Sequence, residues 1–273
     1  MSAQAQQTDS ATLARIADTG RVVIGYVPDA LPLSNRSADG EVTGYSIELC
    51  RIIVADVQAA LDLDSLEVEY RPLMAPRDRQ AAVAGGQVDI ECGASTVTLG
   101  RREKVDFSLL TLITGASSLS LKQTGIRSNA DLDGKRVGLL GDTTTETSFA
   151  EFLEMNEFSA RITRVSNHDE GLGLLDDGKI DAYVSDQTIL VGHIIQAEDP
   201  SQYSLAQDLF SFEPYGLMLP KNDAAFRLIV DRALARTYRT GRIQRLYYDW
   251  FGRYGLQLSP VQRAMYQFQG LAE

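Results

Sequence analysis

The sequence contains few of the residues that build metal and redox sites. Among 273 residues there are two cysteines, two histidines and one tryptophan. Cys50 and Cys92 form neither a CxxC motif nor a metal-ligand spacing, and His168 and His193 stand 25 positions apart. We therefore expect no structural zinc site and no bound metal.

Both cysteines stand in apolar segments, which favours two buried free thiols. A single disulfide is the alternative. It requires the segment around Glu48 to pack against the strand at Ile90, because the two cysteines must come close together.

Long apolar runs and an excess of positive charge are also absent. No stretch reaches the roughly 18 apolar residues that a membrane-spanning helix needs. Asp and Glu number 37 against 26 Lys and Arg, which gives a net charge of −11. This balance argues against a nucleic-acid or anionic-membrane partner. The negative net charge does not exclude an acidic ligand. Salt screens charges beyond about 8 Å, so one nearby arginine outweighs the distant negative surface charge.

Catalytic motifs are missing as well. There is no G-x-S-x-G, no H-E-x-x-H, no phosphate-binding G-x(4)-G-K-[ST], and no GxGxxG after a predicted strand. Asp89 and Glu91 alternate to opposite faces of one strand, so they are not a ready acid–base pair. We expect a protein that is not an enzyme and that needs no cofactor.

Residues 1–11 are small and polar, with no basic start and no apolar signal-peptide core. We expect them to form a disordered tail. Their composition fits the remnant of a removed signal peptide behind an added start methionine, and it fits a cytoplasmic N-terminus equally well.

Apolar periodicity predicts two successive series of alternating strands and helices, the pattern of parallel sheets. The first series has a helix from residue 12 to Gly20, strands at 21–26, 66–70 and 88–90, and helices at 45–60 and 78–85. The second has strands at 136–140, 161–165 and 180–184, and helices up to 155 and at 170–176. Outside these series we expect a loop at 28–40, helices at 223–238 and 241–251, and a weakly amphipathic surface tail from 261.

Two long apolar runs predict crossings between two lobes. The run 107–121 is too long for one strand of five or six residues, and 209–220 is the candidate return crossing. The pattern G-polar-aliphatic-Asp-apolar occurs at both 86–90 and 178–182, which suggests two similar lobes that share a cleft. We place lobe one at 12–113 and 214–273, lobe two at 118–208, and the hinge crossings at 114–117 and 209–213.

The stretch 88–102 is the first candidate for a binding site. It predicts a short buried strand, a break at Gly93, the hydroxyl residues Ser95 and Thr96, and then Arg101. Ligands of open α/β sheets bind beyond the carboxyl ends of strands, and arginine matches a carboxylate with two parallel donors. The simpler alternative is a strand, a turn and a solvated arginine.

Three further candidates follow strands of the second series. The segment 141–146, with Asp142, Thr143 and Thr144, opens a helix whose free N–H groups suit an anion, although an ordinary helix cap is the alternative. Asp186 could hold an ammonium group or cap the helix that starts at Gln187. His168 could donate to a ligand carboxylate or be a satisfied structural histidine.

The ordered set of these features resembles the family 3 extracellular solute-binding proteins of bacterial polar amino-acid ABC importers, nearest to their glutamate/aspartate-binding subgroup. The resemblance covers about residues 12–255. It is carried by Gly25, Gly44-Tyr45, Asp89-Ile90-Glu91-Cys92-Gly93, Thr96, Arg101, Phe107-Ser108, Gly141 to Glu146, Gly178 to Ala182, Asp186 and Tyr215-Gly216.

The resemblance implies a type II periplasmic binding protein fold of two α/β lobes, each a mostly parallel sheet flanked by helices, joined by two crossing strands. It also implies that Arg101 pairs with the ligand α-carboxylate and that Asp186 accepts from the α-ammonium group. The other residues of the expected ligand-binding set are Thr96, Thr143, Thr144, Ala94, Ser95, Asp142, Tyr26, His168, and Arg79 or Arg77.

Two departures from the subgroup fall in the side-chain pocket. Val27 stands where the subgroup has an arginine, and Ala94 stands where it has a serine. The segment 74–79 is one residue longer, so Arg77 and Arg79 compete for one role. A lost charge-assisted contact is worth roughly 1.5–3 kcal/mol, so the resemblance implies a polar, acidic or acidic-derived L-amino acid without fixing which one.

We expect a periplasmic monomer that delivers its ligand to the membrane permease of an ABC importer. One alternative is an enzyme that resembles cyclohexadienyl dehydratase, which needs a protonated carboxylic acid in the cleft, with Glu91 the nearest candidate. Another is the ligand-sensing module of a receptor.

Overall fold

The computed structural model describes residues 10–273, so residues 1–9 of the expected tail lie outside the described residues. The last two tail positions are ordered, which corrects the predicted boundary. Helix α2 (Ala11–Thr19) begins directly after Ser10, whose side chain accepts a hydrogen bond from the Leu13 N–H. The Ser10 hydroxyl in turn donates to Asp223 over 2.9 Å, which ties the start of the fold to its C-terminal third.

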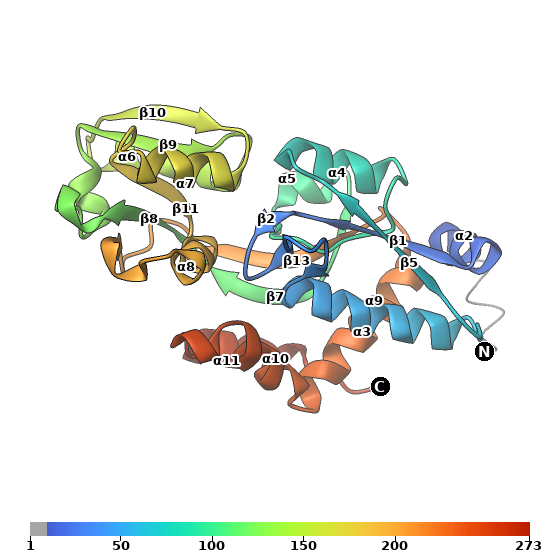
Figure 1. Cartoon of the computed structure of the whole chain (residues 1–273). Helices are drawn as coiled ribbons and strands as arrows, with labels where there is room; N and C mark the ends of the chain where they lie inside the picture. The colour runs from blue at the N-terminus through green and yellow to red at the C-terminus, as the bar shows by residue number, and fades with distance from the viewer. Residues whose placement is uncertain (1–9) are drawn as a thin grey trace.

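Within residues 10–273 the chain forms two five-stranded sheets, one in each lobe, in line with the predicted two-lobed α/β fold (Figure 1). In order across the first sheet lie β5 (Glu67–Pro72), β1 (Arg21–Tyr26), β6 (Ile90–Glu91), β13 (Glu213–Leu219) and β7 (Asp106–Thr114). In order across the second lie β10 (Ala160–Val165), β9 (Lys135–Leu140), β11 (Ala182–Asp186), β8 (Ala116–Leu121) and β12 (Tyr203–Leu205).

Both sheets are mixed rather than mostly parallel. Strand β1 pairs in parallel with β5 and β6, and β9 pairs in parallel with β10 and β11. The antiparallel pairings involve β13 in the first sheet and β8 in the second. Strands β13 and β8 lie next to the crossings between the lobes. Each is antiparallel to the neighbouring strand of a βαβ unit, β6 in the first sheet and β11 in the second.

Helices cover the faces of both sheets. The first lobe contains α2, α3 (Tyr45–Ala60), α4 (Pro76–Ala84), α5 (Leu99–Arg102), α9 (Ala224–Arg239), α10 (Arg242–Trp250) and α11 (Pro260–Gln269). The second contains α6 (Thr144–Met155), α7 (His168–Asp176) and α8 (Gln187–Gln196). Single turns of 3₁₀ helix lie at η1 (Lys122–Thr124), η2 (Asn129–Leu132), η3 (Pro200–Gln202) and η4 (Gly252–Tyr254). None of the helices within residues 10–273 has the length and apolar character needed to cross a membrane.

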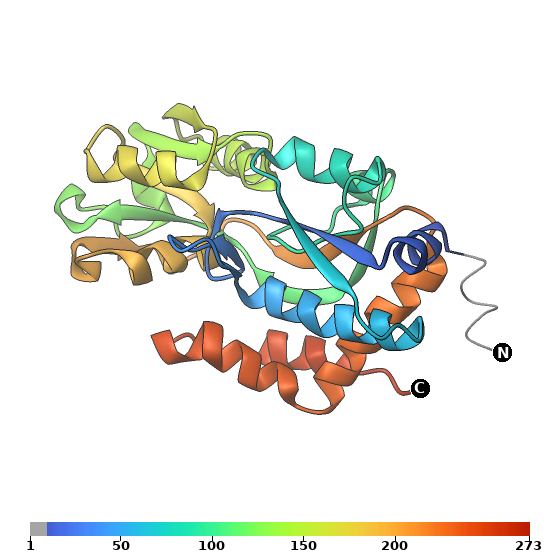
Figure 2. The same ribbon diagram turned by 45° about the vertical axis from the view of Figure 1, so that its right-hand side comes forward.

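The two apolar runs form the crossings, which Figures 1 and 2 show side by side between the lobes. Strand β7 ends at Thr114, and β8 begins in the other sheet at Ala116. The return strand β13 starts at Glu213, which pairs with Thr114. Gly115 between β7 and β8 allows the crossings to pack tightly, because a methyl group there would overlap the Ser211 carbonyl oxygen. The exact lobe boundaries given above stay a prediction.

Two segments differ from the sequence-based expectation. The expected loop 28–40 contributes to a small sheet of β2 (Asp29–Ala30), β3 (Ser34–Arg36) and β4 (Val42–Thr43). Strands of two or three residues are too short to show an alternating pattern. The expected surface tail contains helix α11, whose Tyr266 is buried in the main core and donates to the Thr111 carbonyl over 2.9 Å.

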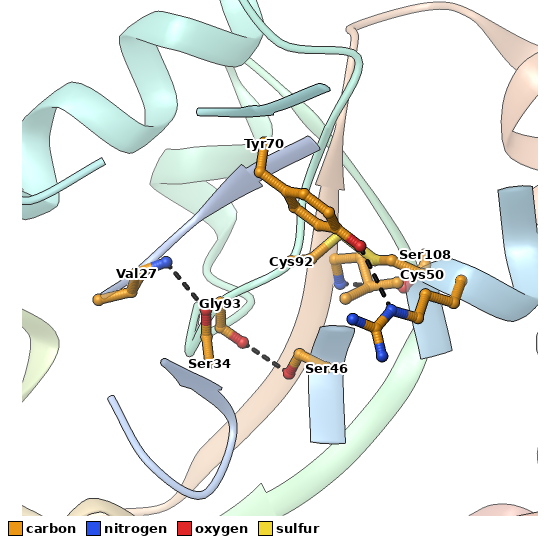
Figure 3. Close-up of a disulfide and its surroundings, with 10 residues drawn as sticks. Val27, Ser34, Ser46, Cys50, Tyr70, Cys92, Gly93 and Ser108 are labelled. Carbon is orange, nitrogen blue, oxygen red and sulfur yellow. Dashed lines mark hydrogen bonds between the residues drawn. A yellow bond between two sulfur atoms is a disulfide. The ribbon is translucent and has the colours of Figure 1, made fainter. Parts of the chain in front are cut away.

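Cys50 and Cys92 form a disulfide, so the preferred expectation of two free thiols is wrong. The bond joins α3 to the residue that follows β6 (Figure 3). One helical turn before Cys50, the Ser46 hydroxyl donates to the Gly93 carbonyl over 2.8 Å. Residues four apart on a helix face the same way, so α3 fixes the loop after β6 at two points. This pairing was not visible from spacing, because it depends on how α3 packs.

Replacing both cysteines by serine should lower the free energy of unfolding by about 2–4 kcal/mol, because the unfolded chain regains the freedom of the closed loop. Chemical denaturation measures the loss. The wild-type protein should lose the same amount in a reductant that leaves the double variant unaffected. Equal stability of the oxidised wild type and the variant would contradict this prediction.

Candidate ligand-binding site

A cavity lies between the two lobes, where strand ends of both sheets face each other. From the first lobe it is lined by Pro76, Arg79, Ala94, Ser95, Thr96, Arg101 and Met218. From the second lobe it is lined by Leu140, Thr143, Thr144, Thr145, His168, Val184, Ser185, Asp186 and Ile189.

Nine of the twelve sequence-predicted residues line this cavity. They are Arg101, Thr96, Asp186, Thr143, Thr144, Ala94, Ser95, His168 and Arg79. Seven of them come from segments that the sequence indicated, namely the loop after β6, the short helix α5, the start of α6 and the end of β11. His168 and Arg79 come from the starts of α7 and α4.

Three predicted residues lie elsewhere. Tyr26 is buried in the core, with its ring edge-on to Tyr70 at 6.2 Å between ring centroids. The Arg77 side chain is 76% exposed beside Asp78, whereas Arg79 is buried. Of the two arginines, Arg79 is therefore the one that lines the cavity. Asp142 lies in the turn before α6, where its N–H donates to Glu146.

Arg101 is one of two arginines in the cavity wall. It belongs to the short helix α5, whose first turn is capped by the Thr98 hydroxyl. Its Nη1 donates to the Thr96 carbonyl over 2.7 Å. Burial and the neighbouring Arg79 lower the pKa of Arg101, and the carboxylates Glu91, Glu213 and Asp186 act in the opposite direction. The guanidinium group is thus held in a fixed position and faces acidic groups.

Two buried carboxylates share the cavity region. Asp186 accepts from the Thr145 hydroxyl over 3.2 Å and from the Tyr215 hydroxyl. Glu213 accepts from the hydroxyl groups of Thr96 and Thr144, over 2.6 and 2.9 Å. Burial and the negative charge of Glu213 raise the pKa of Asp186 to about 7, because a low-dielectric environment and a nearby like charge both disfavour its ionised form.

Asp186 is the last residue of β11 and directly precedes α8, but its side chain makes no capping hydrogen bond to that helix. The helix-cap alternative for this residue is therefore not what the structure shows. Its partners are instead two hydroxyl groups of the cavity region.

His168 is a neutral group in the site. It is the first residue of α7, and its backbone N–H donates to Asp29 over 2.6 Å. Its Nδ1 lies 2.9 Å from the Tyr183 hydroxyl. Burial lowers the pKa of His168 to about 4, and burial lowers that of His193 to about 3.

Arg79 is buried, and its Nη2 lies 3.5 Å from the Met74 carbonyl. Its Nε has no hydrogen-bond partner among residues 10–273. A buried guanidinium with an unused donor in a cavity wall can bind a polar ligand group. Among those residues, no cluster of three or more histidine, cysteine or acidic side chains is placed to hold a metal ion.

Four polar residues of the site region were not in the predicted ligand-binding set. Thr145 and Ser185 stand next to predicted residues, so the same motifs could have included them. Glu213 and Tyr215 lie on the return strand β13, and no local motif marks them as part of a site. The antiparallel pairing of the crossing strands brings them into hydrogen-bonding contact with the cavity residues Thr96 and Asp186, and sequence spacing does not reveal that pairing.

The lobes also contact each other around the cavity. The Thr96 and Thr144 hydroxyl groups, one from each lobe, lie 3.2 Å apart. The Asp29–His168 hydrogen bond joins β2 to α7. Gly192 of α8 lies directly against the Leu31 carbonyl, where a methyl group would overlap the carbonyl oxygen. The cavity is therefore enclosed by contacts that hold both lobes together.

The model of the bacterial extracellular solute-binding proteins, family 3, matches residues 22–253. The chain belongs to this family. It is 33% identical over 241 residues to an L-glutamate/L-aspartate-binding protein of Pseudomonas aeruginosa, covering 88% of this chain and 80% of that protein. It is 28% identical over 240 residues to a glutamate/aspartate import solute-binding protein of Escherichia coli, covering 88% and 79%.

A similar solved structure is that of an ancestral amino acid-binding protein described as a precursor of cyclohexadienyl dehydratase. It is 26% identical, has a TM-score of 0.76, and covers 88% of this chain and 100% of that chain. Both curated relatives of this solute-binding protein are named as binding proteins, one of them for import, and neither is named as an enzyme. Glu91, the acid that a dehydratase would require, does not line the cavity.

Proposed function

We propose that this solute-binding protein captures a polar, acidic or acidic-derived L-amino acid in the interlobe cavity and delivers it to an ABC importer from the periplasm. One observation carries the proposal: Arg101 from one lobe and Asp186 from the other converge on the same buried cavity. These are the two charges that complement the two ends of an α-amino acid. The names of the curated relatives and the extracellular family support the transport role.

The α-carboxylate would lie against Arg101, with Thr96 as a second donor. The start of α6, with Thr144 and Thr145, would add backbone N–H groups and the positive end of the helix dipole. The α-ammonium group would lie against Asp186. These groups form a backbone clamp, defined as Arg101, Thr96, the start of α6 and Asp186, that does not depend on the ligand side chain.

The ligand side chain would point toward Arg79 and His168. Because the Tyr183 hydroxyl has a pKa raised well above its usual range by burial, it stays protonated and can donate to His168 Nδ1. His168 Nε2 would then carry the proton and act as a donor. Two donors at this end suit a carboxylate or a carbonyl oxygen. Val27 is apolar and adds no third donor, which leaves acid and amide side chains as competing ligands.

Replacing Arg101 by alanine should weaken amino-acid binding by about 2–5 kcal/mol, at least a roughly 30-fold increase in Kd, because the α-carboxylate loses its cation in a buried site. Titration calorimetry against a panel of L-amino acids measures the loss. Arg77→Ala is the matched control, because that arginine is exposed and should not change Kd. Equal Kd values for wild type and Arg101→Ala would contradict the assignment of Arg101 as the residue that binds the α-carboxylate.

Amino-acid affinity should fall as the pH drops below about 7, by up to about tenfold per pH unit. The pKa of Asp186 is raised to about 7, so this carboxyl is increasingly protonated below that pH and cannot pair with the ammonium group. Asp186→Asn should bind weakly and show a flat profile over the same range. A wild-type Kd that stays constant from pH 5 to 8 would exclude this role.

Replacing Gly192 by alanine should weaken ligand binding at least about tenfold, because its methyl group would hold the lobes apart at the Leu31 carbonyl. Gly173→Ala is the control, since no atom lies within 4 Å of a methyl group added there. Calorimetry gives the Kd values. With ligand present, small-angle scattering should show that the Gly192→Ala protein is more extended than the wild type. Equal affinity of the two variants would show that closure does not depend on this contact.

A further inference from the structure

Glu213 is a buried carboxylate whose partners are hydroxyl groups. It is the first residue of β13, and its exposed fraction is 2%. Its Oε2 accepts from the Thr96 hydroxyl over 2.6 Å and from the Thr144 hydroxyl over 2.9 Å. Its Oε1 accepts from the Ser211 hydroxyl over 2.9 Å. Three hydroxyl protons are therefore directed at one carboxylate.

The two crossings hold Glu213 at the hinge. Its backbone pairs with Thr114 of β7. Ser211, which donates to the Glu213 carboxylate, also accepts the Ala116 N–H over 2.9 Å. Of the two threonines on Oε2, Thr96 comes from the first lobe and Thr144 from the second. A single oxygen atom at the hinge thus joins a hydroxyl group of each lobe.

These hydrogen bonds determine what the two threonines can offer a ligand. A threonine hydroxyl carries one proton and two lone pairs. Once the proton is donated to Glu213, the oxygen can only accept from a further partner. The Thr96 and Thr144 hydroxyl oxygens lie 3.2 Å apart, and both residues line the cavity together with Asp186. The cavity wall therefore presents two hydroxyl acceptors in addition to the Asp186 carboxylate.

We propose that Glu213 is a positioning residue of the ligand site: by taking the hydroxyl protons of Thr96 and Thr144, it turns both oxygens into acceptors for the α-ammonium group of the ligand. The inference rests on the proposed function and deepens it. An ammonium group has three N–H donors, and Asp186, Thr96 and Thr144 would supply three acceptors.

The α-carboxylate is then bound by other atoms of the same threonines. As donors to it, Thr96 and Thr144 use their backbone N–H groups instead of their hydroxyl protons. Thr144 is suited to this role because it is the first residue of α6, and the N–H groups of a first helical turn have no partner within the helix.

Three substitutions of Glu213 separate hydrogen-bond acceptance from charge and from volume. Glu213→Gln keeps an acceptor oxygen at the same reach and loses the charge. Glu213→Asp keeps the charge on a side chain one methylene shorter, and Glu213→Met keeps the volume without an acceptor or a charge. Calorimetry against the panel of L-amino acids at pH 8 measures Kd. Asp186 is mostly ionised at that pH, because its pKa is about 7 in the wild type and loss of the Glu213 charge lowers it.

Glu213→Met should weaken binding at least about tenfold relative to the wild type, because the freed hydroxyl groups can turn their protons toward the ammonium group. Glu213→Gln should bind at least about fivefold more tightly than Glu213→Met, because its amide oxygen can accept both protons. Glu213→Asp should bind more weakly than Glu213→Gln. Thermal unfolding of each variant confirms that it is folded.

Asp223→Asn is the matched control. This buried carboxylate accepts from the Ser10 hydroxyl over 2.9 Å and caps α9, but it lies outside the cavity. It should leave Kd unchanged.

Affinities of Glu213→Gln and Glu213→Met within about twofold of each other overturn the proposal, and so does a Glu213→Met affinity within about twofold of wild type. If Glu213→Met does not fold, the other pair decides, and Glu213→Asp binding as tightly as Glu213→Gln or more tightly overturns the proposal. A protein that binds no L-amino acid of the panel contradicts the proposed function. Binding that fails these comparisons contradicts only the role of Glu213.

Discussion

The attraction between Arg101 and the carboxylates Asp186 and Glu213 lies at the boundary of the two lobes, and the site depends on it. These groups come from α5, from the end of β11 and from the start of β13. Each lies in a low-dielectric environment, where a lone charge is costly and a paired charge is strongly attracted. An α-amino acid carries both signs of charge and can satisfy these groups together, so under the proposed function recognition and lobe closure would use the same interaction.

This interaction requires a rigid first lobe. The disulfide Cys50–Cys92 and the Ser46–Gly93 hydrogen bond fix the loop after β6 to α3, three residues before Thr96. Helix α3 is itself packed against α9 in the main core. Binding groups must be held within fractions of an ångström to act together. The order of the backbone clamp therefore derives from packing well away from the cavity.

The sequence predicted those parts of the structure that depend on local patterns. Periodicity located α3 and β1 at their observed ends, because one side of each is buried over many residues. The predicted strand ends indicated Thr96, Arg101 and Asp186 as site residues, because a βαβ topology brings the carboxyl ends of parallel strands to one edge of the sheet. The apolar run at 107–121 is longer than one ordinary strand, and its length indicated a crossing between the lobes.

The remaining features depend on contacts between distant segments, and local patterns do not contain them. Glu213 enters the site through its pairing opposite Thr114, and the disulfide forms through the packing of α3 against β6. The small sheet β2–β4 is built from strands too short to be periodic. Arg77 and Arg79 have the same chemistry two positions apart, and only the helical turn of α4 decides which one is buried.

The two ends of the cavity follow different physical rules. At the backbone end, Arg101 and Asp186 face charges that every α-amino acid carries, so this end cannot distinguish one ligand from another. At the side-chain end, Arg79 and the neutral His168 line the same cavity. Selectivity is a difference between affinities, so under the proposed function it must come from the side-chain end, where the donors of Arg79 and His168 would meet the part of the ligand that varies.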